Sequence, residues 1–169
     1  MKKIVVALIA MLILAAPAAF AETKIAYVDL QKALNLSKAG AQAKSDISAL
    51  VKKYEAEFKG KQEELLKKKD ELEKQAALLS DSAKAEKERE YQRDVTELQR
   101  FQKDVKDELQ QKDAEHTKRI LNELFEILQK MGEDGKYTMI LEKNEGAVIY
   151  AAESVDLTDE LIKAYDTSK

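Results

Sequence analysis

Apolar residues recur at every seventh position through the middle of the chain, which is the spacing of a coiled coil. In the first half of this region one column is apolar throughout, and it consists of Val51, Phe58, Leu65, Leu72 and Leu79. Its companion column starts apolar and then becomes polar; it consists of Ile47, Tyr54, Lys61, Lys68 and Gln75. The pattern predicts a long helix with one continuous apolar seam.

The second half of the region repeats the pattern as a return helix. One column consists of Tyr91, Leu98 and Val105, with Val95, Gln102 and Leu109 beside it. The seam then passes through Lys112 and the single histidine, His116, before it resumes at Ile120, Leu124, Ile127 and Met131. We interpret His116 as a polar interruption of the seam, with a proton-sensing role as the alternative. The reversal between the two helices is predicted near residues 78–83.

Both helices carry acidic and basic residues four positions apart on their outer faces. These pairs are Glu57/Lys61, Glu63/Lys67, Glu64/Lys68, Asp70/Lys74 and Glu108/Lys112. Each such pair adds only a few tenths of a kcal/mol to a helix, about 0.2–0.5 kcal/mol, but together they favour helix where tertiary contacts are few. The region 37–130 is therefore predicted to be a helical hairpin arm.

Short strand-like segments flank the arm. Residues 24–29 alternate and are β-branched, which predicts a strand, and Asp29 is expected to cap a short helix after it. After the arm, the runs 136–143 and 147–151 predict two strands of a β-hairpin with a three-residue loop. Thr158 is expected to cap a last short helix.

The predicted fold class is α+β. A long antiparallel coiled-coil hairpin projects from a small β-rich head made of residues 22–36 and 131–169. Because this head has few residues and apolar side chains on both faces of its strands, it needs cover from another copy or closure into a barrel. We therefore expect a homo-oligomer, with an interface formed by Ile25, Tyr27, Leu141, Val148 and Tyr150.

The first 21 residues have the pattern of a secretory signal peptide. Lys2 and Lys3 precede an unbroken apolar run over residues 4–14, and Ala19-Phe20-Ala21 is a small-x-small cleavage site. The run is shorter than the roughly 20 residues that span a membrane. We expect cleavage after Ala21 and a mature protein in the periplasm.

Composition narrows the functional classes. The chain has 36% charged residues and no cysteine, and loss of Lys2 and Lys3 changes its net charge from −3 to −5. This balance argues against a nucleic-acid-binding protein. No phosphate-binding loop, paired-cysteine metal motif or Ser-His-Asp set occurs, so we expect no enzyme, no cofactor and no metal. Several apolar residues near the arm tip could instead contact a non-native chain: Leu65, Leu66, Leu72, Leu78, Leu79 and Tyr91.

The two ends of the mature chain resemble a known family. Residues 24–30, KIAYVDL, are similar to the opening of the Skp/OmpH family of periplasmic chaperones, and the segments 137–144, 148–152 and 154–162 are similar to its closing part. The resemblance implies a homotrimer whose strands form a central β-barrel. It also implies an ATP-independent holdase that binds unfolded outer-membrane proteins and prevents their aggregation.

The charge of this chain departs from the resemblance. Well-known members are basic, whereas the arm here carries equal numbers of acidic and basic residues, and the head carries the whole negative excess. This argues against electrostatic capture, membrane contact and lipopolysaccharide binding. The alternative function is an envelope adaptor whose hairpin docks a specific folded partner, which would require a defined complementary stripe at the arm tip.

Overall fold

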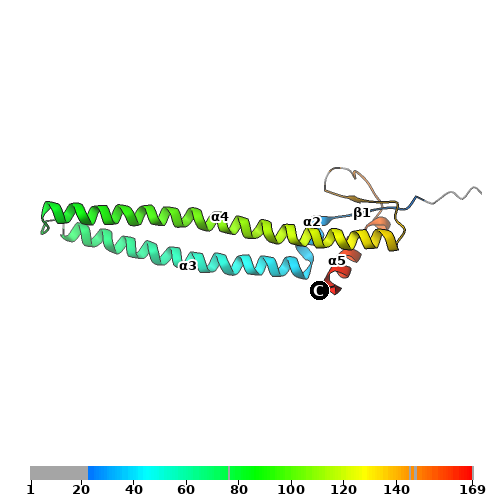
Figure 1. Cartoon of the computed structure of the whole chain (residues 1–169), viewed down its shortest axis with the longest axis horizontal. Coiled ribbons are helices and arrows are strands. Elements are labelled where there is room, and N and C mark those ends of the chain that lie inside the picture. Colours follow the sequence, from blue (N-terminus) through cyan, green and yellow to red (C-terminus); the bar gives the residue numbers. More distant parts are fainter. Residues whose placement is uncertain (1–22, 76, 145, 147, 169) are drawn as a thin grey trace, which may run out of the picture.

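The computed structural model describes residues 23–75, 77–144, 146 and 148–168. Its elements are β1 (Ile25–Val28), α2 (Leu30–Leu36), α3 (Lys38–Gln75), α4 (Asp81–Asp134), β2 (Met139–Glu142), the 3-10 helix η1 (Glu153–Val155) and α5 (Thr158–Thr167). Figure 1 shows α3 and α4 side by side as one long arm, with the other elements gathered at one end as a head. The predicted signal peptide lies outside the described residues.

The arm is two long helices that have no proline and few glycines to interrupt them. Helix α3 has 38 residues and α4 has 54, so α4 continues past the arm and into the head. Ser80 caps α4, because its hydroxyl accepts a hydrogen bond from the amide of Ala83 at 3.3 Å. Residues 81–83 are thus already helical, and the reversal lies between Gln75 and Asp81, slightly earlier than the predicted segment 78–83.

The apolar residues of the predicted seam are only half-buried along most of the arm, and the seam positions Lys68 and Gln102 are exposed. Full burial in α4 begins near the head, at Ile120, Leu124 and Leu128. The seven-residue pattern included Ile120 and Leu124 and missed Leu128. At the base α4 contacts α2 and α5 as well as α3, so a wider stripe of its surface is covered there than a two-helix seam would cover.

A one-residue joint connects the head to the arm. Asp29 caps α2, as predicted, by accepting a hydrogen bond from the amide of Lys32 at 2.7 Å. Helix α2 ends at Leu36, Ser37 is extended, and α3 begins at once. The buried Ser37 hydroxyl accepts from the amide of Gly40 at 3.1 Å. This sharp corner holds α2 in the head while α3 leaves along the arm.

The sheet differs from the predicted hairpin. β1 and β2 pair in parallel, with Ile25 opposite Met139 and Val28 opposite Glu142, and the whole arm forms their crossover. The predicted antiparallel hairpin is wrong, because β2 takes β1 as its partner and residues 148–151 form no strand in the single chain. A strand needs a hydrogen-bonded neighbour, and β-branched residues alone do not provide one.

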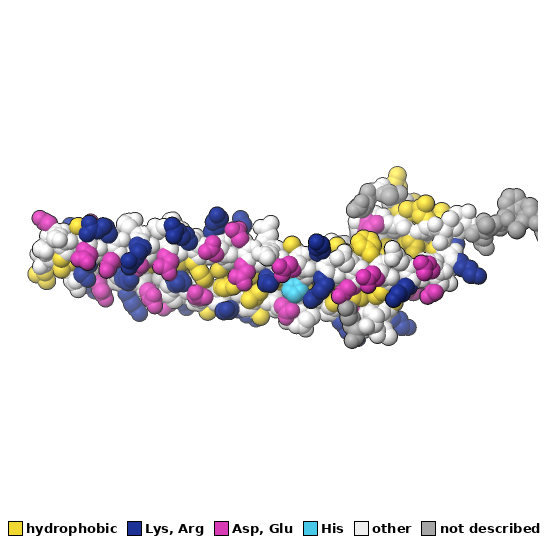
Figure 2. All heavy atoms as spheres, in the orientation of Figure 1, with side chains coloured by type: hydrophobic (Ala, Val, Ile, Leu, Met, Phe, Trp, Pro, Cys, Tyr) yellow, Lys and Arg dark blue, Asp and Glu magenta, His cyan; other side chains and the backbone are white. Residues whose placement is uncertain are grey.

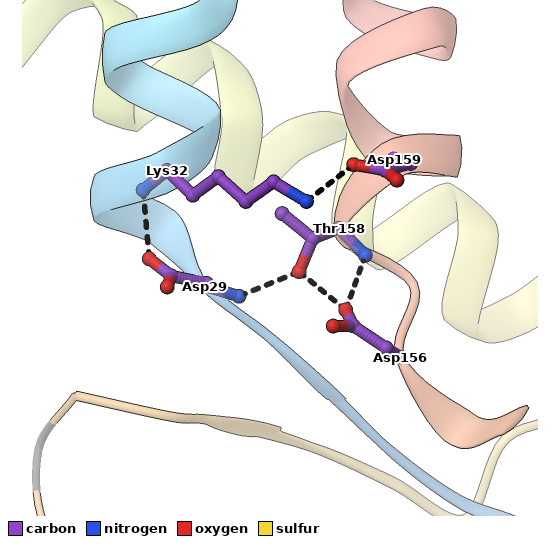
Figure 3. Close-up of polar contacts among 5 residues, drawn as sticks. All are labelled: Asp29, Lys32, Asp156, Thr158 and Asp159. Atoms are coloured by element: carbon purple, nitrogen blue, oxygen red, sulfur yellow. Dashed lines mark hydrogen bonds and ion pairs between the residues drawn. The ribbon is translucent and has the colours of Figure 1, made fainter. Parts of the chain in front are cut away.

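The C-terminal segment closes the head on β1 and α2. Tyr27 forms an isolated parallel bridge with Asp156, and the amide of Leu157 donates to the Tyr27 carbonyl at 2.9 Å. Thr158 is the first residue of α5 and not its cap, which corrects the prediction. Its amide donates to the Asp156 carboxylate at 2.9 Å, and its hydroxyl accepts from the amide of Asp29 at 2.9 Å (Figure 3).

Helix α5 joins the head core to the base of both arm helices. Leu161 and Tyr165 are buried against α4 together with Ala33 of α2. On the polar side, Lys32 of α2 pairs with Asp159 at 2.7 Å, as Figure 3 shows. The carboxylate of Asp166 accepts a hydrogen bond from the amide of Lys38, the first residue of α3, at 2.9 Å. The C-terminal helix therefore fixes the corner from which the arm starts.

Candidate functional site

An apolar groove lies beside the sheet of the head. It has a volume of about 420 Å³, and it is lined by Ile25, Ala26, Tyr27, Leu141, Val148, Ile149, Tyr150, Ala151 and Val155. The structure therefore brings together all five residues predicted for the oligomer interface, although they come from three separate segments of the chain. The groove combines side chains of β1, β2 and the segment that precedes η1.

The five predicted residues differ in how much surface they offer. Tyr150 is 89% exposed and Ile25 is 46% exposed, whereas Leu141 and Val148 are half-buried. Tyr27 is already buried within the single chain, so it forms the wall of the groove. Ile149, which the prediction omitted, is the most exposed apolar residue here at 99%. Its β-branched side chain within an apolar run was the signal available in the sequence.

The wall of the groove is tied to a polar network. Burial and a hydrogen bond with Asp156 raise the pKa of Tyr27. Burial also acts to raise the pKa of Asp156, but hydrogen bonds from the side chain and backbone of Thr158 outweigh it and hold that pKa below its usual value. Asp156 therefore stays ionised next to the groove at neutral pH, where it anchors both Tyr27 and the start of α5.

The residues predicted to contact a client fall into two groups. Leu66 and Leu78 are 60% and 87% exposed on the outside of the arm. The other four face the seam and are half-buried: Leu65, Leu72, Leu79 and Tyr91. The outer surface of the arm thus offers two isolated leucines, and most of its apolar side chains contact the partner helix.

Ion pairs across the seam replace apolar contacts in the outer half of the arm. Lys61 of α3 lies 3.8 Å from Glu97 of α4, and Lys68 pairs with Asp94. The hydrogen bond with Asp94 raises the pKa of Lys68. Of the five predicted pairs within one helix, Asp70/Lys74 forms; Lys61 and Lys68 turn to the other helix instead, because the seam column places them beside its acidic side chains.

His116 lies at the base of the arm, where it is half-buried on the seam. Its Nδ1 atom is 3.3 Å from the Arg119 guanidinium, and its ring lines a hollow together with Ala43, Asp113 and Thr117. In the part of the chain that the structure describes, no group of three or more His, Cys, Asp or Glu side chains could hold a metal ion. No helix among the described residues is long and apolar enough to cross a membrane.

Charge is distributed evenly along the arm. Figure 2 shows basic and acidic side chains interspersed along it, and apolar side chains gathered over the head on the face that is visible. The arm therefore presents no single-sign field to a ligand, while the head presents an apolar surface. These two features define the candidate functional surfaces of the chain.

The comparisons with known proteins agree on a family. The chain matches the family described as outer membrane protein (OmpH-like) over residues 24–165, so it belongs to this family. None of the curated proteins compared with the chain matches it. The fold is similar to the crystal structure of a protein of Caulobacter crescentus CB15 that is described as a candidate outer membrane chaperone (OmpH-like). The TM-score is 0.81 and the identity is 18%, with 87% of this chain and 86% of the other covered.

Proposed function

We propose that the protein is an ATP-independent holdase of the periplasm that binds unfolded outer-membrane proteins and prevents their aggregation. The OmpH-like family supports a role of the chaperone type. The observation that carries the finer proposal is the shape of the chain, a long charge-balanced arm on a small apolar head. Such an arm provides length and diffuse contact without a defined stripe for one folded partner.

The groove of the head supports self-association. Its rim carries Tyr150 and Ile149, which are almost fully exposed in the single chain, and large apolar side chains of this kind are usually covered in an assembly. The sheet has two strands, and the outer edge of β2 would gain hydrogen bonds from an added strand, whereas β1 is already bridged to Asp156 on its other side. We propose that copies meet here as a homotrimer, with their strands in one barrel and their arms projecting.

The proposed function is tested by measuring whether the protein prevents the aggregation of an outer-membrane β-barrel precursor. The precursor is diluted from urea into purified mature protein without nucleotide, and light scattering follows its aggregation. Suppression that saturates near one oligomer per precursor is expected. A folded, oligomeric protein that leaves the aggregation unchanged would refute the holdase and favour the adaptor.

The adaptor remains the second candidate because Leu66 and Leu78 are exposed near the arm tip. An adaptor would bind one folded envelope protein through a small cluster of contacts. A pull-down from an envelope extract with Leu66→Ala/Leu78→Ala as control distinguishes the two. If the wild type captures one folded protein and the variant does not, the adaptor is indicated. If the wild type captures many unfolded precursors, the holdase is indicated.

A further inference from the structure

The closed arm shows little apolar surface to a client. Among the described residues between Lys38 and Arg119, the large apolar side chains with high exposure are Leu66 and Leu78. Two separate leucines cannot supply the many simultaneous contacts by which a holdase retains a chain without nucleotide. Because the apolar groove of the head is assigned to self-association, a client would need a further apolar surface in the arm.

The largest apolar reserve of the outer arm is its own seam. In its outer half the seam holds Leu65, Leu72, Leu79, Tyr91, Val95 and Leu98, and all of them are half-buried. In α3 the only fully buried residue is Gly40, at the base, and in α4 full burial begins at Ile120. The outer seam is thus covered by one partner helix on one side and reached by water on the others.

Two surface hollows lie along the outer seam. The first, of about 130 Å³, has Leu65 and Leu98 at its apolar part, and the second, of about 240 Å³, has Leu72 and Tyr91. Lys68 lines both, so the hollows follow one another along the same flank of the arm. Both hollows are open to solvent, as is one of about 230 Å³ at the base, so water reaches the outer seam beside these side chains.

The contacts that close this flank are weak ones. The Lys61–Glu97 pair has side chains that are 34% and 67% exposed, and in the Lys68–Asp94 pair the lysine is 52% and the aspartate 20% exposed. Ion pairs that remain in water contribute little to stability, and salt screens them. A pair of this kind holds the two helices in register and can be broken without a large cost.

The base of the arm is held much more firmly. The carboxylate of Asp166 in α5 accepts a hydrogen bond from the amide of Lys38, and the hydroxyl of Ser37 accepts one from the amide of Gly40. Ile120 and Leu124 of α4 are fully buried at the same end of the arm. Helix α4 continues into the head without a break, whereas α3 is joined to α2 of the head through the single residue Ser37. We therefore expect α3 to be the helix that moves. The short reversal between Gln75 and Asp81 keeps the outer ends of the two helices joined, so they would separate between that turn and this base.

We propose that the outer seam is a concealed client site, which opens when residues 61–72 of α3 separate from residues 87–98 of α4. This rests on the proposed function and names the surface that performs it. The occupant is an apolar segment of an unfolded polypeptide, which takes the place of the partner helix against Leu65, Leu72, Tyr91 and Leu98. The hollows are its first points of entry, and the Lys61–Glu97 and Lys68–Asp94 pairs are the closure that it displaces.

The charges around the hollows support a polypeptide as the occupant. Their rims alternate three lysines with acidic residues: Lys61, Glu64, Lys68, Glu71, Lys87, Glu90, Asp94 and Glu97. A rim of both signs complements neither a nucleic acid nor an anionic lipid head group. It suits a chain that carries apolar side chains between polar ones of either charge, as an unfolded barrel strand does.

A disulfide across the outer seam tests the proposal, and the absence of native cysteine makes it specific. Lys68→Cys with Asp94→Cys leaves the seam leucines in place, and Leu65→Cys with Leu98→Cys is a second pair across the first hollow. The matched control is Ala43→Cys with Thr117→Cys, which spans a hollow at the base. Each variant is compared oxidised and reduced in the aggregation assay with a barrel precursor.

We expect the oxidised outer pairs to require an at least about tenfold higher protein concentration than their reduced forms for the same suppression of aggregation, because a client is held by many contacts made together. The control variant with the disulfide at the base of the arm should suppress aggregation equally well when oxidised and when reduced. If the oxidised outer pairs hold as well as the reduced ones, the concealed site is refuted and the proposed function stands. If the wild-type protein fails to hold the precursor, the proposed function itself fails, and the site with it.

Discussion

At the scale of single residues, the corner between head and arm depends on two small side chains. A Cβ atom on Gly40 would lie 1.8 Å from the Leu34 carbonyl oxygen, so a side chain has no space there. Ser37 is fully buried beside it and satisfies the Gly40 amide. Gly60, in the middle of α3, has nothing within 4 Å of the corresponding position. The two glycines of α3 thus differ: Gly40 has no space for a side chain, and Gly60 has free space around it.

Gly40→Ala is expected to destabilise the protein, and Gly60→Ala to stabilise it. The first forces α2 and α3 apart at a close backbone contact, at a cost of about 1–3 kcal/mol, as for other overpacked sites. The second replaces a flexible residue in an exposed helix and gains about 0.5–1 kcal/mol. Urea unfolding followed by circular dichroism measures both, and equal signs for the two variants would contradict the corner geometry.

Asp156 should make the stability of the head depend on acid pH. Its pKa is held below the usual value in the folded chain, so the ionised carboxylate stabilises the fold at all pH values above its unfolded pKa near 4. That contribution is lost as the pH falls through the lower pKa of the folded state. Asp156→Asn is expected to be less stable at neutral pH and to show a flatter loss below about pH 4. Urea midpoints between pH 6 and pH 2.5 test this, and parallel curves for the two proteins would contradict it.

At the scale of elements, helix α5 provides a hydrogen-bond acceptor for the N-terminus of α3. The first amides of α3 cannot bond within their own helix, and one of them donates to Asp166 from α5. Tyr165, one residue earlier, is buried and donates its hydroxyl hydrogen to Glu123 of α4. Consecutive residues of α5 thus fasten the two arm helices to the head, one by a cap and the other by a buried contact.

Asp166→Ala should loosen the start of α3 without unfolding the head. Loss of a capping carboxylate costs about 0.5–2 kcal/mol, and the effect should be local to the first turn. Hydrogen exchange is expected to become faster at Lys38 and the residues that follow it, with the Ile120 region unchanged. Lys163→Ala, on an exposed position of the same helix, is the control and should exchange like the wild type. An identical exchange pattern for both variants would show that the Asp166 contact does not hold the arm.

At the scale of the whole molecule, the exposed apolar surface lies in the head, whereas the arm provides the length. The head groove gathers the most exposed large apolar residues, Ile149 and Tyr150, and the arm extends from it with both charges mixed. A chain of this kind buries little on its own, since the fully buried core consists of a few side chains at the junction of α2, α4 and α5. Association through the head would complete that core.

Tyr150→Asp is expected to dissociate the proposed oligomer, because it places a charge inside the apolar groove. Sedimentation velocity should show a change from oligomer to monomer. Leu78→Asp is the matched control: Leu78 is as exposed as Tyr150, at 87% against 89%, but it lies at the arm tip and should leave the oligomer intact. An unchanged sedimentation profile for Tyr150→Asp would count against assembly through this groove.

The sequence by itself determined the features that depend on local pattern. The seven-residue repeat, the long run without proline and the cap at Asp29 predicted two long helices and a short one, because helix periodicity and capping act over a few residues. The terminal motifs identified the family. The five groove residues were selected from their apolar character, and the structure places them together although they are distant in the chain.

Only the tertiary structure decided which partner each segment takes. Residues 136–143 and 147–151 favoured a hairpin by composition, yet β2 pairs with β1 across the whole arm, because strand pairing depends on contacts between distant residues. Likewise, Lys61 and Lys68 could pair within α3 and instead pair across the seam. Thr158 was predicted to cap α5, but it is the first residue of that helix, and its amide donates to the carboxylate of Asp156. These choices belong to long-range packing, which no local pattern encodes.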